Sequence, residues 1–125
     1  MSLRFIRIAV VYLVIGALLG YYMGITQQFA LTPVHVHVTL AGWLTLAVAG
    51  LVYHLYPDAA LTRLARAHFW LHNIGLPVFM VGLALMLTGS QGVMAVIAAG
   101  ASTLLIGLVL FAANVLLNVK APGSK

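Results

Sequence analysis

The sequence predicts an all-α integral membrane protein, a four-helix bundle with both termini in the cytoplasm. Three observations predict this fold class. Hydrophobic residues make up 64% of the 125 residues, and charged residues only 6%. Ordinary soluble domains hold roughly 25% charged residues, so a soluble chain of this size could not bury so much apolar surface. The third observation is a set of four long apolar runs without strand-like alternation, at about 6–25, 34–56, 65–87 and 93–117.

Each run is long enough to be a membrane span. About 20 residues cross ~30 Å of hydrocarbon as a helix, and backbone groups inside lipid must be satisfied within the segment. The run 6–25 is too long for a usual signal-peptide core and lacks a convincing cleavage site, so we expect it to be retained. Residues 1–125 are therefore predicted to form a single transmembrane domain, with loops at 57–62 and 120–125.

The basic residues predict the orientation. They fall at the N-terminus, in the loop after the second run and in the tail: Arg4, Arg7, Arg63, Arg66, Lys120 and Lys125. The connections 26–33 and 88–92 carry no charge. By the positive-inside rule, both termini and the middle loop lie in the cytoplasm, and a bacterial inner membrane is the expected location. Six dispersed basic residues form no patch, which argues against nucleic acid as a partner.

The composition also limits the chemistry. The chain has no cysteine, which excludes disulfides, thiolate ligands and covalent c-type haem attachment. Asp58 is the single acidic residue, which excludes hydrolysis by a carboxylate pair and carboxylate-bridged metal centres. No Ser-His-Asp set or glycine-rich phosphate loop is present. Histidine, methionine and tyrosine chemistry remains, and it suits haem or copper.

Five histidines form two groups. His35 and His37 lie at the outer end of the second span, where an ionisable residue is costly and indicates function. Imidazole is a common metal ligand and a usual axial ligand of haem iron. In a regular helix the two side chains point roughly 200° apart and face different neighbours. His54 follows His37 by 17 positions, ~25 Å along the helix axis, so His37 is not expected to share a metal with His54, His68 or His72.

The inner group suggests a possible second site. His68 and His72 are four residues apart on one helix face, a spacing that can chelate a copper or another transition-metal ion, with His54 as a possible third ligand. Interfacial roles stay open as well. His68 follows Arg66 and is expected to reach interfacial water, and His35 can equally cap or anchor its helix end.

Small residues recur at spacings that let helices approach closely. They are Gly16, Gly20 and Gly24 in the first run, Gly75, Gly82 and Gly89 in the third, and Ala95, Ala99, Thr103 and Gly107 in the fourth. Ordinary bundle packing explains them. A homo-oligomer interface, or room for a flat cofactor, is the alternative. The fourth run looks structural, and we expect its Asn114 to bond a neighbouring helix.

The segment 35–57, which begins His-Val-His-Val-Thr-Leu-Ala-Gly-Trp, resembles the second membrane helix of the haem–copper oxidase catalytic subunit superfamily. It is closest to the nitric oxide reductase and C-type oxidase branches, and the segment 63–75 is similar to the next helix in relatives of that group. In that family a histidine near the outer end of the second helix is an axial ligand of low-spin haem b. The resemblance implies His37 as the haem ligand and His35 as the second candidate.

The family's later helices, which carry its second low-spin ligand and its copper ligands, have no counterpart in this chain. A haem–copper binuclear centre is therefore not expected. The sixth iron ligand would come from a second copy of the chain or from a methionine such as Met86, or the iron would have no sixth ligand. Gly42 lies on the predicted face of His35. We expect a membrane haem b protein for electron transfer or for gas or redox sensing. The alternatives are a copper or other transition-metal binding protein, or a cofactor-free accessory subunit of a larger respiratory complex.

Overall fold

The computed structural model describes residues 1–120 of the 125, so the predicted tail beyond Lys120, including Lys125, lies outside the described residues. The described part is helical almost throughout. Its elements are α1 (Ser2–Thr26), α2 (Thr32–His37), the π-helix η1 (Val38–Thr45), α3 (Leu46–Leu55), α4 (Pro57–Ala60), α5 (Arg63–Leu87) and α6 (Met94–Asn118). Because α2, η1 and α3 follow one another without a gap, they form one continuous span of 24 residues.

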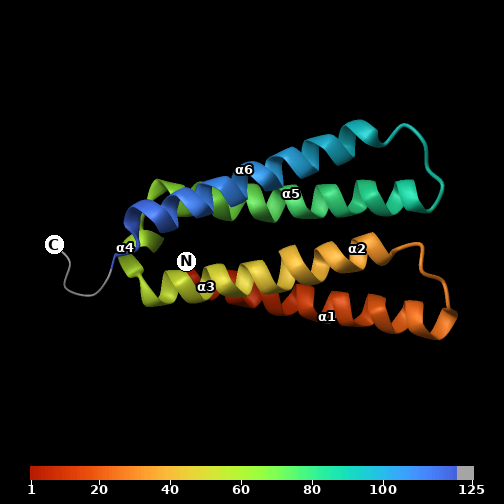
Figure 1. The fold of residues 1–125 in the computed structure, drawn as a ribbon, viewed down its shortest axis with the longest axis horizontal. Coiled ribbons are helices and arrows are strands. Elements are labelled where there is room, and N and C mark those ends of the chain that lie inside the picture. The colour runs from red at the N-terminus through yellow and green to blue at the C-terminus, as the bar shows by residue number, and fades with distance from the viewer. Residues whose placement is uncertain (121–125) are drawn as a thin grey trace.

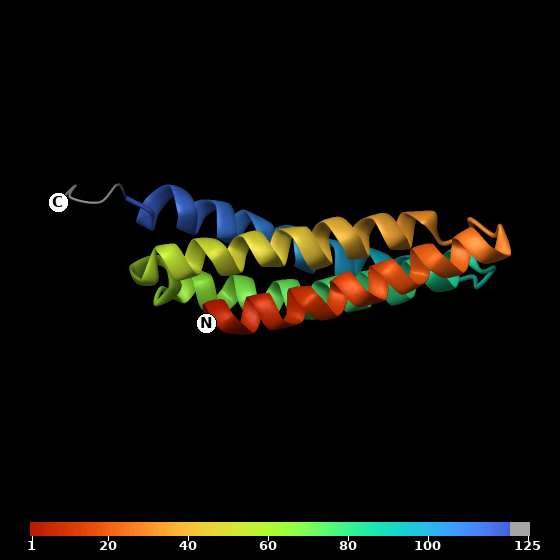
Figure 2. The same ribbon diagram turned by 90° about the horizontal axis from the view of Figure 1, so that it is seen from below.

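Within residues 1–120, four helices are long and apolar enough to cross a membrane, which confirms the predicted all-α four-helix bundle. They form two hairpins that lie side by side, α1 with α2–η1–α3 and α5 with α6 (Figures 1 and 2). The start of α1, the short helix α4 and the end of α6 lie at one end of the bundle (Figure 1). This end carries Arg4, Arg7, Arg63 and Arg66, and we call it the basic end. The opposite end, with the connections 27–31 and 88–93, is the uncharged end.

The helix boundaries differ from the predicted runs by a few residues. The helix α1 begins four residues before its apolar run, because a spanning helix continues past the hydrocarbon into the interface, where basic side chains are favourable. The predicted loop 57–62 contains α4, and Pro57 occupies its first turn, where no backbone N–H is needed. Thr62 then caps α5, since its side-chain oxygen accepts a hydrogen bond from the N–H of Ala65 at 3.0 Å.

The second span departs from the predicted regular helix. Eight residues, Val38–Thr45, adopt a π-helix directly after His37. Such segments are rare and occur frequently at functional sites. Side chains donate to backbone carbonyls inside this segment: the Thr45 hydroxyl donates to the carbonyl of Leu40 at 2.8 Å, and His72 of α5 donates to that of Ala41 at 3.0 Å.

Glycines bring α5 and α6 into backbone contact. A Cβ added at Gly75 would lie 2.5 Å from the backbone nitrogen of Leu104, and one added at Gly100 would meet the backbone of Phe79. The predicted contact role is therefore confirmed for Gly75 and Gly82 of α5 and for Gly107 of α6, where an added Cβ would lie 3.2 Å from the backbone nitrogen of His72. Gly89 lies beyond α5 with nothing within 4 Å, and Ala95 and Ala99 are exposed. A Cβ at Gly24 would meet nothing within 4 Å, so the third glycine of the first run plays no part in packing.

Candidate functional site

His35 is held against α1. Its Nδ1 lies 2.9 Å from the carbonyl oxygen of Gly16. A Cβ added at Gly20 would lie 2.9 Å from Cε1 of the His35 ring, so the missing side chain makes room for this imidazole. The small-residue pattern of the first run thus serves a histidine that joins α2 to α1.

His37 faces the other hairpin. Its ring meets the ring of Phe79 in α5 edge-on, with centroids 5.0 Å apart, and its Nδ1 lies 2.7 Å from the carbonyl oxygen of Pro33. The predicted divergence of His35 and His37 is confirmed, because one contacts α1 and the other α5. The two rings of one chain do not converge on a single point.

The hydrogen bonds of these two rings fix their tautomers. A carbonyl oxygen only accepts, so Nδ1 carries a proton in both His35 and His37, and in the neutral ring Nε2 keeps its lone pair. No hydrogen bond joins either Nε2 to another residue within 1–120. A metal-binding histidine has this arrangement, in which one ring nitrogen donates to a carbonyl and the other faces the metal. Both rings are partly exposed.

Gly42 and Met86 are the other two residues proposed near a haem, and Gly42 faces α1 as His35 does. A Cβ added at Gly42 would lie 2.6 Å from Cγ of Tyr12, so this glycine packs against the tyrosine ring of α1. Met86 is 37% exposed and follows Phe79 by seven residues, ~10 Å further toward the uncharged end. Met86 therefore lies about two helical turns away from Phe79, the residue that His37 contacts.

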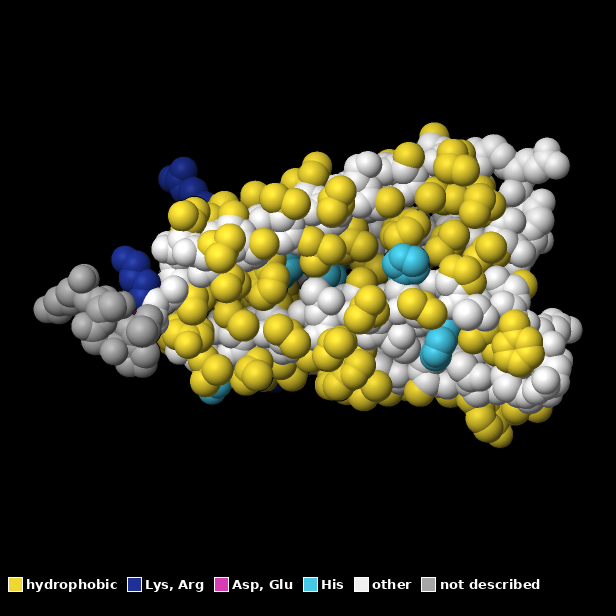
Figure 3. All heavy atoms as spheres, in the orientation of Figure 1, with side chains coloured by type: hydrophobic (Ala, Val, Ile, Leu, Met, Phe, Trp, Pro, Cys, Tyr) yellow, Lys and Arg dark blue, Asp and Glu magenta, His cyan; other side chains and the backbone are white. Residues whose placement is uncertain are grey.

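An open apolar groove of about 440 Å³ lies between α1, the second span and α5, lined by residues that include Leu19, Val34, Val38 and Met80. Neither His35 nor His37 is among its lining residues. Figure 3 shows histidine side chains on the outer face of the molecule, in the half toward the uncharged end. Within residues 1–120, His37 is thus a partly exposed imidazole that does not line this groove.

His68 and His72 are completely buried, so the expectation that His68 reaches interfacial water is wrong. They share the inner face of α5 with Ala65, while Arg66 lies on the exposed face. Nε2 of His68 lies 3.4 Å from Nδ1 of His72, and the Tyr53 hydroxyl lies 3.3 Å from Nδ1 of His68.

Asn114 of α6 continues this series of hydrogen bonds. Its Nδ2 donates to the Tyr53 oxygen at 3.3 Å and to the carbonyl of Ala59 at 2.9 Å, which confirms that Asn114 bonds neighbouring helices. Its Oδ1 accepts from the Thr62 hydroxyl at 3.0 Å and from Asn118 at 2.8 Å. We call the buried series formed by Asn114, Tyr53, His68, His72 and the Ala41 carbonyl the polar chain.

The end of the polar chain determines its direction. The Ala41 carbonyl only accepts, so His72 donates through Nε2–H and its Nδ1 is left to accept. His68 must then donate through Nε2–H, and its Nδ1 accepts the proton of the Tyr53 hydroxyl. With both rings neutral, every hydrogen bond that links these members therefore points from the basic end toward the π-helix, and every buried polar atom has a partner.

The rings around His68 are aromatic. Phe5 of α1 stacks on it with centroids 5.1 Å apart and planes 26° apart, and Phe111 of α6 stacks on it at 4.8 Å and 28°. His68 thus lies between two aromatic rings from different helices. Sequence reasoning did not single out Tyr53, Phe5 or Phe111, because an aromatic residue near a helix end is typical of the interfacial belt of any membrane protein.

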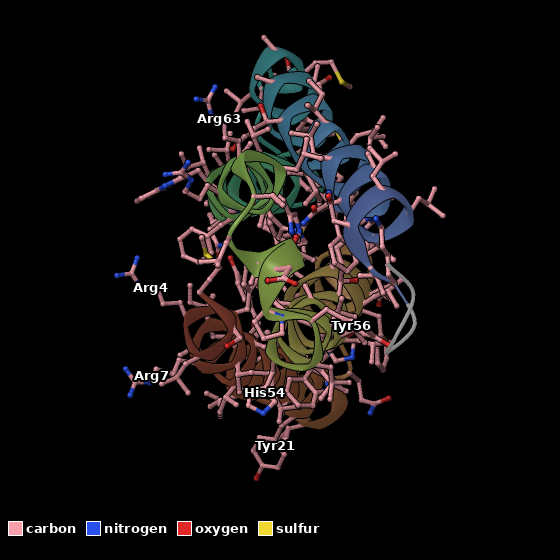
Figure 4. All side chains as sticks on the ribbon, turned by 90° about the vertical axis from the view of Figure 1, so that its left-hand side faces the viewer. Arg4, Arg7, Tyr21, His54, Tyr56 and Arg63 are labelled. Atoms are coloured by element: carbon pink, nitrogen blue, oxygen red, sulfur yellow. The ribbon has the colours of Figure 1, made fainter. Side chains whose placement is uncertain are left out.

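His54 does not join the inner histidines. It is exposed, and Figure 4, which looks at the basic end, shows it at the rim of the bundle. Arg4, Arg7 and Arg63 also lie at this rim. Within residues 1–120 no three histidine or acidic side chains are grouped to hold a metal ion. All four ring nitrogens of His68 and His72 take part in hydrogen bonds.

The chain matches no family model, no curated protein and no solved structure. The function is therefore inferred from the chemistry of these side chains.

Proposed function

We propose that this protein is a membrane haem b protein for electron transfer or for gas or redox sensing, with Nε2 of His37 as an iron ligand. The observation that carries the proposal is the hydrogen bond from Nδ1 of His37 to the carbonyl of Pro33, which leaves the Nε2 lone pair available on a partly exposed ring. The resemblance of the segment 35–57 to the haem-binding helix of the oxidase superfamily supports it. A bound haem would supply a one-electron couple of its iron.

The two outer histidines take different roles in this proposal. His35 is held to α1 through Gly16 and fits tightly against Gly20, so it positions the helix that carries His37. A second imidazole for the same iron must come from another chain, since His35 and His37 diverge. We therefore propose a homo-oligomer in which the His37 residues of two copies face one haem, enclosed by apolar surfaces of both. The basic end would face the cytoplasm of a bacterial cell.

An absorption spectrum of the detergent-purified protein tests the proposal. We expect a Soret band and, after dithionite reduction, a sharp α band, with haem b identified by the pyridine haemochrome assay. The variant His37→Ala should lose the Soret band, whereas His54→Ala, which changes an exposed histidine at the basic end, should keep it.

Stoichiometry tests the shared site. One haem for every two chains is expected from bis-histidine ligation across an interface. A featureless spectrum after expression with added haem would contradict the cytochrome assignment. A Soret band that survives in His37→Ala but not in His35→Ala would exchange the two roles.

A further inference from the structure

The polar chain carries an inference that does not depend on haem. We propose that His68 and His72 form a buried binding site for one proton, loaded from the basic end through Tyr53. The site would hold a single positive charge inside the bundle, within the first three turns of α5. Its ligand is a proton delivered by water, and no other co-reactant is needed.

The first argument is the direction of the hydrogen bonds. Tyr53 points its O–H at Nδ1 of His68, which points its Nε2–H at Nδ1 of His72. Tyr53 can pass its proton to His68 and regain one from water, which leaves the tyrosine neutral and His68 as imidazolium. His68 can then pass its Nε2 proton to His72, which becomes the imidazolium while His68 returns to neutral. One proton has left the water and one cation has formed on the pair.

The second argument is the surroundings of the pair. Phe5 and Phe111 lie on either side of the His68 ring with centroids 5.1 and 4.8 Å away, within the ~6 Å over which an aromatic face attracts a cation. A protonated His72 would keep its Nε2–H on the Ala41 carbonyl at 3.0 Å. Both positions that the proton can occupy therefore have a neighbour that favours positive charge.

The third argument is access from one side. Tyr53 is one of the residues that line an open groove of about 370 Å³ at the basic end, together with Ser2, His54 and Pro57. Beyond His72 toward the uncharged end, the neighbouring core is apolar, formed by residues that include Leu76, Met80 and Val38. The polar chain thus reaches one surface of the bundle and ends at the π-helix.

Among residues 1–120, no charged side chain contacts the pair. The elements packed around it contribute Phe5 from α1, the Ala41 carbonyl from η1, Tyr53 from α3, and Phe111 and Asn114 from α6. The pair's titratable neighbours are thus each other and Tyr53. The charged side chains nearest in sequence, Arg4, Arg7, Asp58, Arg63 and Arg66, are exposed.

Nitrogen NMR of the full chain in lipid vesicles tests the binding of the proton. With ring-¹⁵N histidine, the buried pair should show the Nε2–H tautomer at both rings near neutral pH, and one imidazolium per chain on acidification while the fold persists. Signals are assigned by their loss in His72→Asn. At a fixed acidic pH, Phe111→Leu should reduce the imidazolium fraction of the pair several-fold, whereas Phe79→Leu, which contacts His37 instead, should not. A pair that stays neutral until the protein unfolds would overturn the proposal.

The route is tested by kinetics. Time-resolved infrared spectroscopy after photolytic proton release should show imidazolium formation slowed at least tenfold in Tyr53→Phe. Tyr56→Phe removes the same hydroxyl three residues away, outside the polar chain, and should react at the wild-type rate. Equal rates in Tyr53→Phe and the wild type would overturn the route through Tyr53. Circular dichroism and the neutral-pH NMR spectrum confirm that each variant is folded.

Discussion

Tyr53 and His54 are consecutive residues, yet Tyr53 is 2% exposed and hydrogen-bonded to His68, while His54 lies on the outer surface. Neighbouring residues on a helix point in directions about 100° apart, so only one of the two rings can face the bundle interior. The tyrosine takes the inner position and becomes part of the polar chain. The histidine, which the sequence suggested as a metal ligand, is left at the rim of the groove.

Asn114→Leu should destabilise the bundle. The change leaves the Tyr53 oxygen without its donor from Asn114 and removes one of the two side-chain donors to the buried carbonyl of Ala59, the other being the Thr62 hydroxyl. We expect a loss of about 1 to 2 kcal/mol in the free energy of unfolding, measured by steric trapping in bicelles. Asn118→Leu is the matched control, because Asn118 is partly exposed and donates only to Asn114. Equal effects of the two changes would show that the buried hydrogen bonds of Asn114 do not contribute to the free energy of unfolding.

Gly100→Ala should also destabilise the fold. Its new methyl group would collide with the backbone of Phe79, which cannot move aside as the end of a side chain can. Overpacking of this kind costs about 1 to 3 kcal/mol, and the same unfolding measurement detects it. In Gly24→Ala the methyl group meets nothing within 4 Å, so that variant should be neutral or slightly more stable. A neutral Gly100→Ala would mean that α5 and α6 separate at little cost.

His35→Leu should weaken the first hairpin. The change removes the hydrogen bond between the His35 ring and the Gly16 carbonyl, which joins α2 to α1 at 2.9 Å. A loss of about 1 kcal/mol is expected. His54→Leu should leave stability unchanged, because that ring is exposed and its side chain makes no hydrogen bond within residues 1–120. The comparison separates a positioning role of His35 from ligation, which the absorption spectrum reports independently.

The orientation can be tested directly because the chain contains no cysteine. Ser90→Cys lies in the uncharged connection, and Asp58→Cys lies in α4 at the basic end. A membrane-impermeant maleimide added to spheroplasts should label the first variant and spare the second, as the positive-inside rule requires. Labelling of Asp58→Cys in intact spheroplasts would reverse the proposed topology.

The sequence predicts the number, type and approximate ends of the membrane helices, because these follow from the length and hydropathy of each apolar run. It also predicts that His35 and His37 face different neighbours and that Asn114 bonds another helix. It does not predict that His68 is buried. The position of Arg66 two residues earlier suggests an interfacial site, but the two side chains lie on different faces of α5, and burial depends on how α1 and α6 pack against that helix.

The sequence also does not predict that Tyr53 and two phenylalanine rings contact His68. Phe5, Tyr53 and Phe111 come from three helices, and only the tertiary arrangement brings them to one imidazole. Aromatic residues near helix ends have the same pattern whether they face lipid headgroups or the interior. The direction of each helix face must be known before such a residue can be assigned to a site.

The π-helix η1 separates the orientations of the two ends of the second span. Tyr53 follows His35 by 18 residues, about five turns of a regular α-helix, so an uninterrupted helix would present both side chains in one direction. In the structure the His35 ring is hydrogen-bonded to α1, whereas the Tyr53 hydroxyl is hydrogen-bonded to side chains of α5 and α6 and the Tyr53 ring also meets Phe5 of α1. A π-helix has wider turns than an α-helix, so the segment Val38–Thr45 changes the direction of Tyr53 relative to His35 from that of a regular α-helix. Deleting one residue from this segment would rotate the part of the span that carries His35 relative to the part that carries Tyr53. The length of η1 therefore determines which helices these two side chains contact.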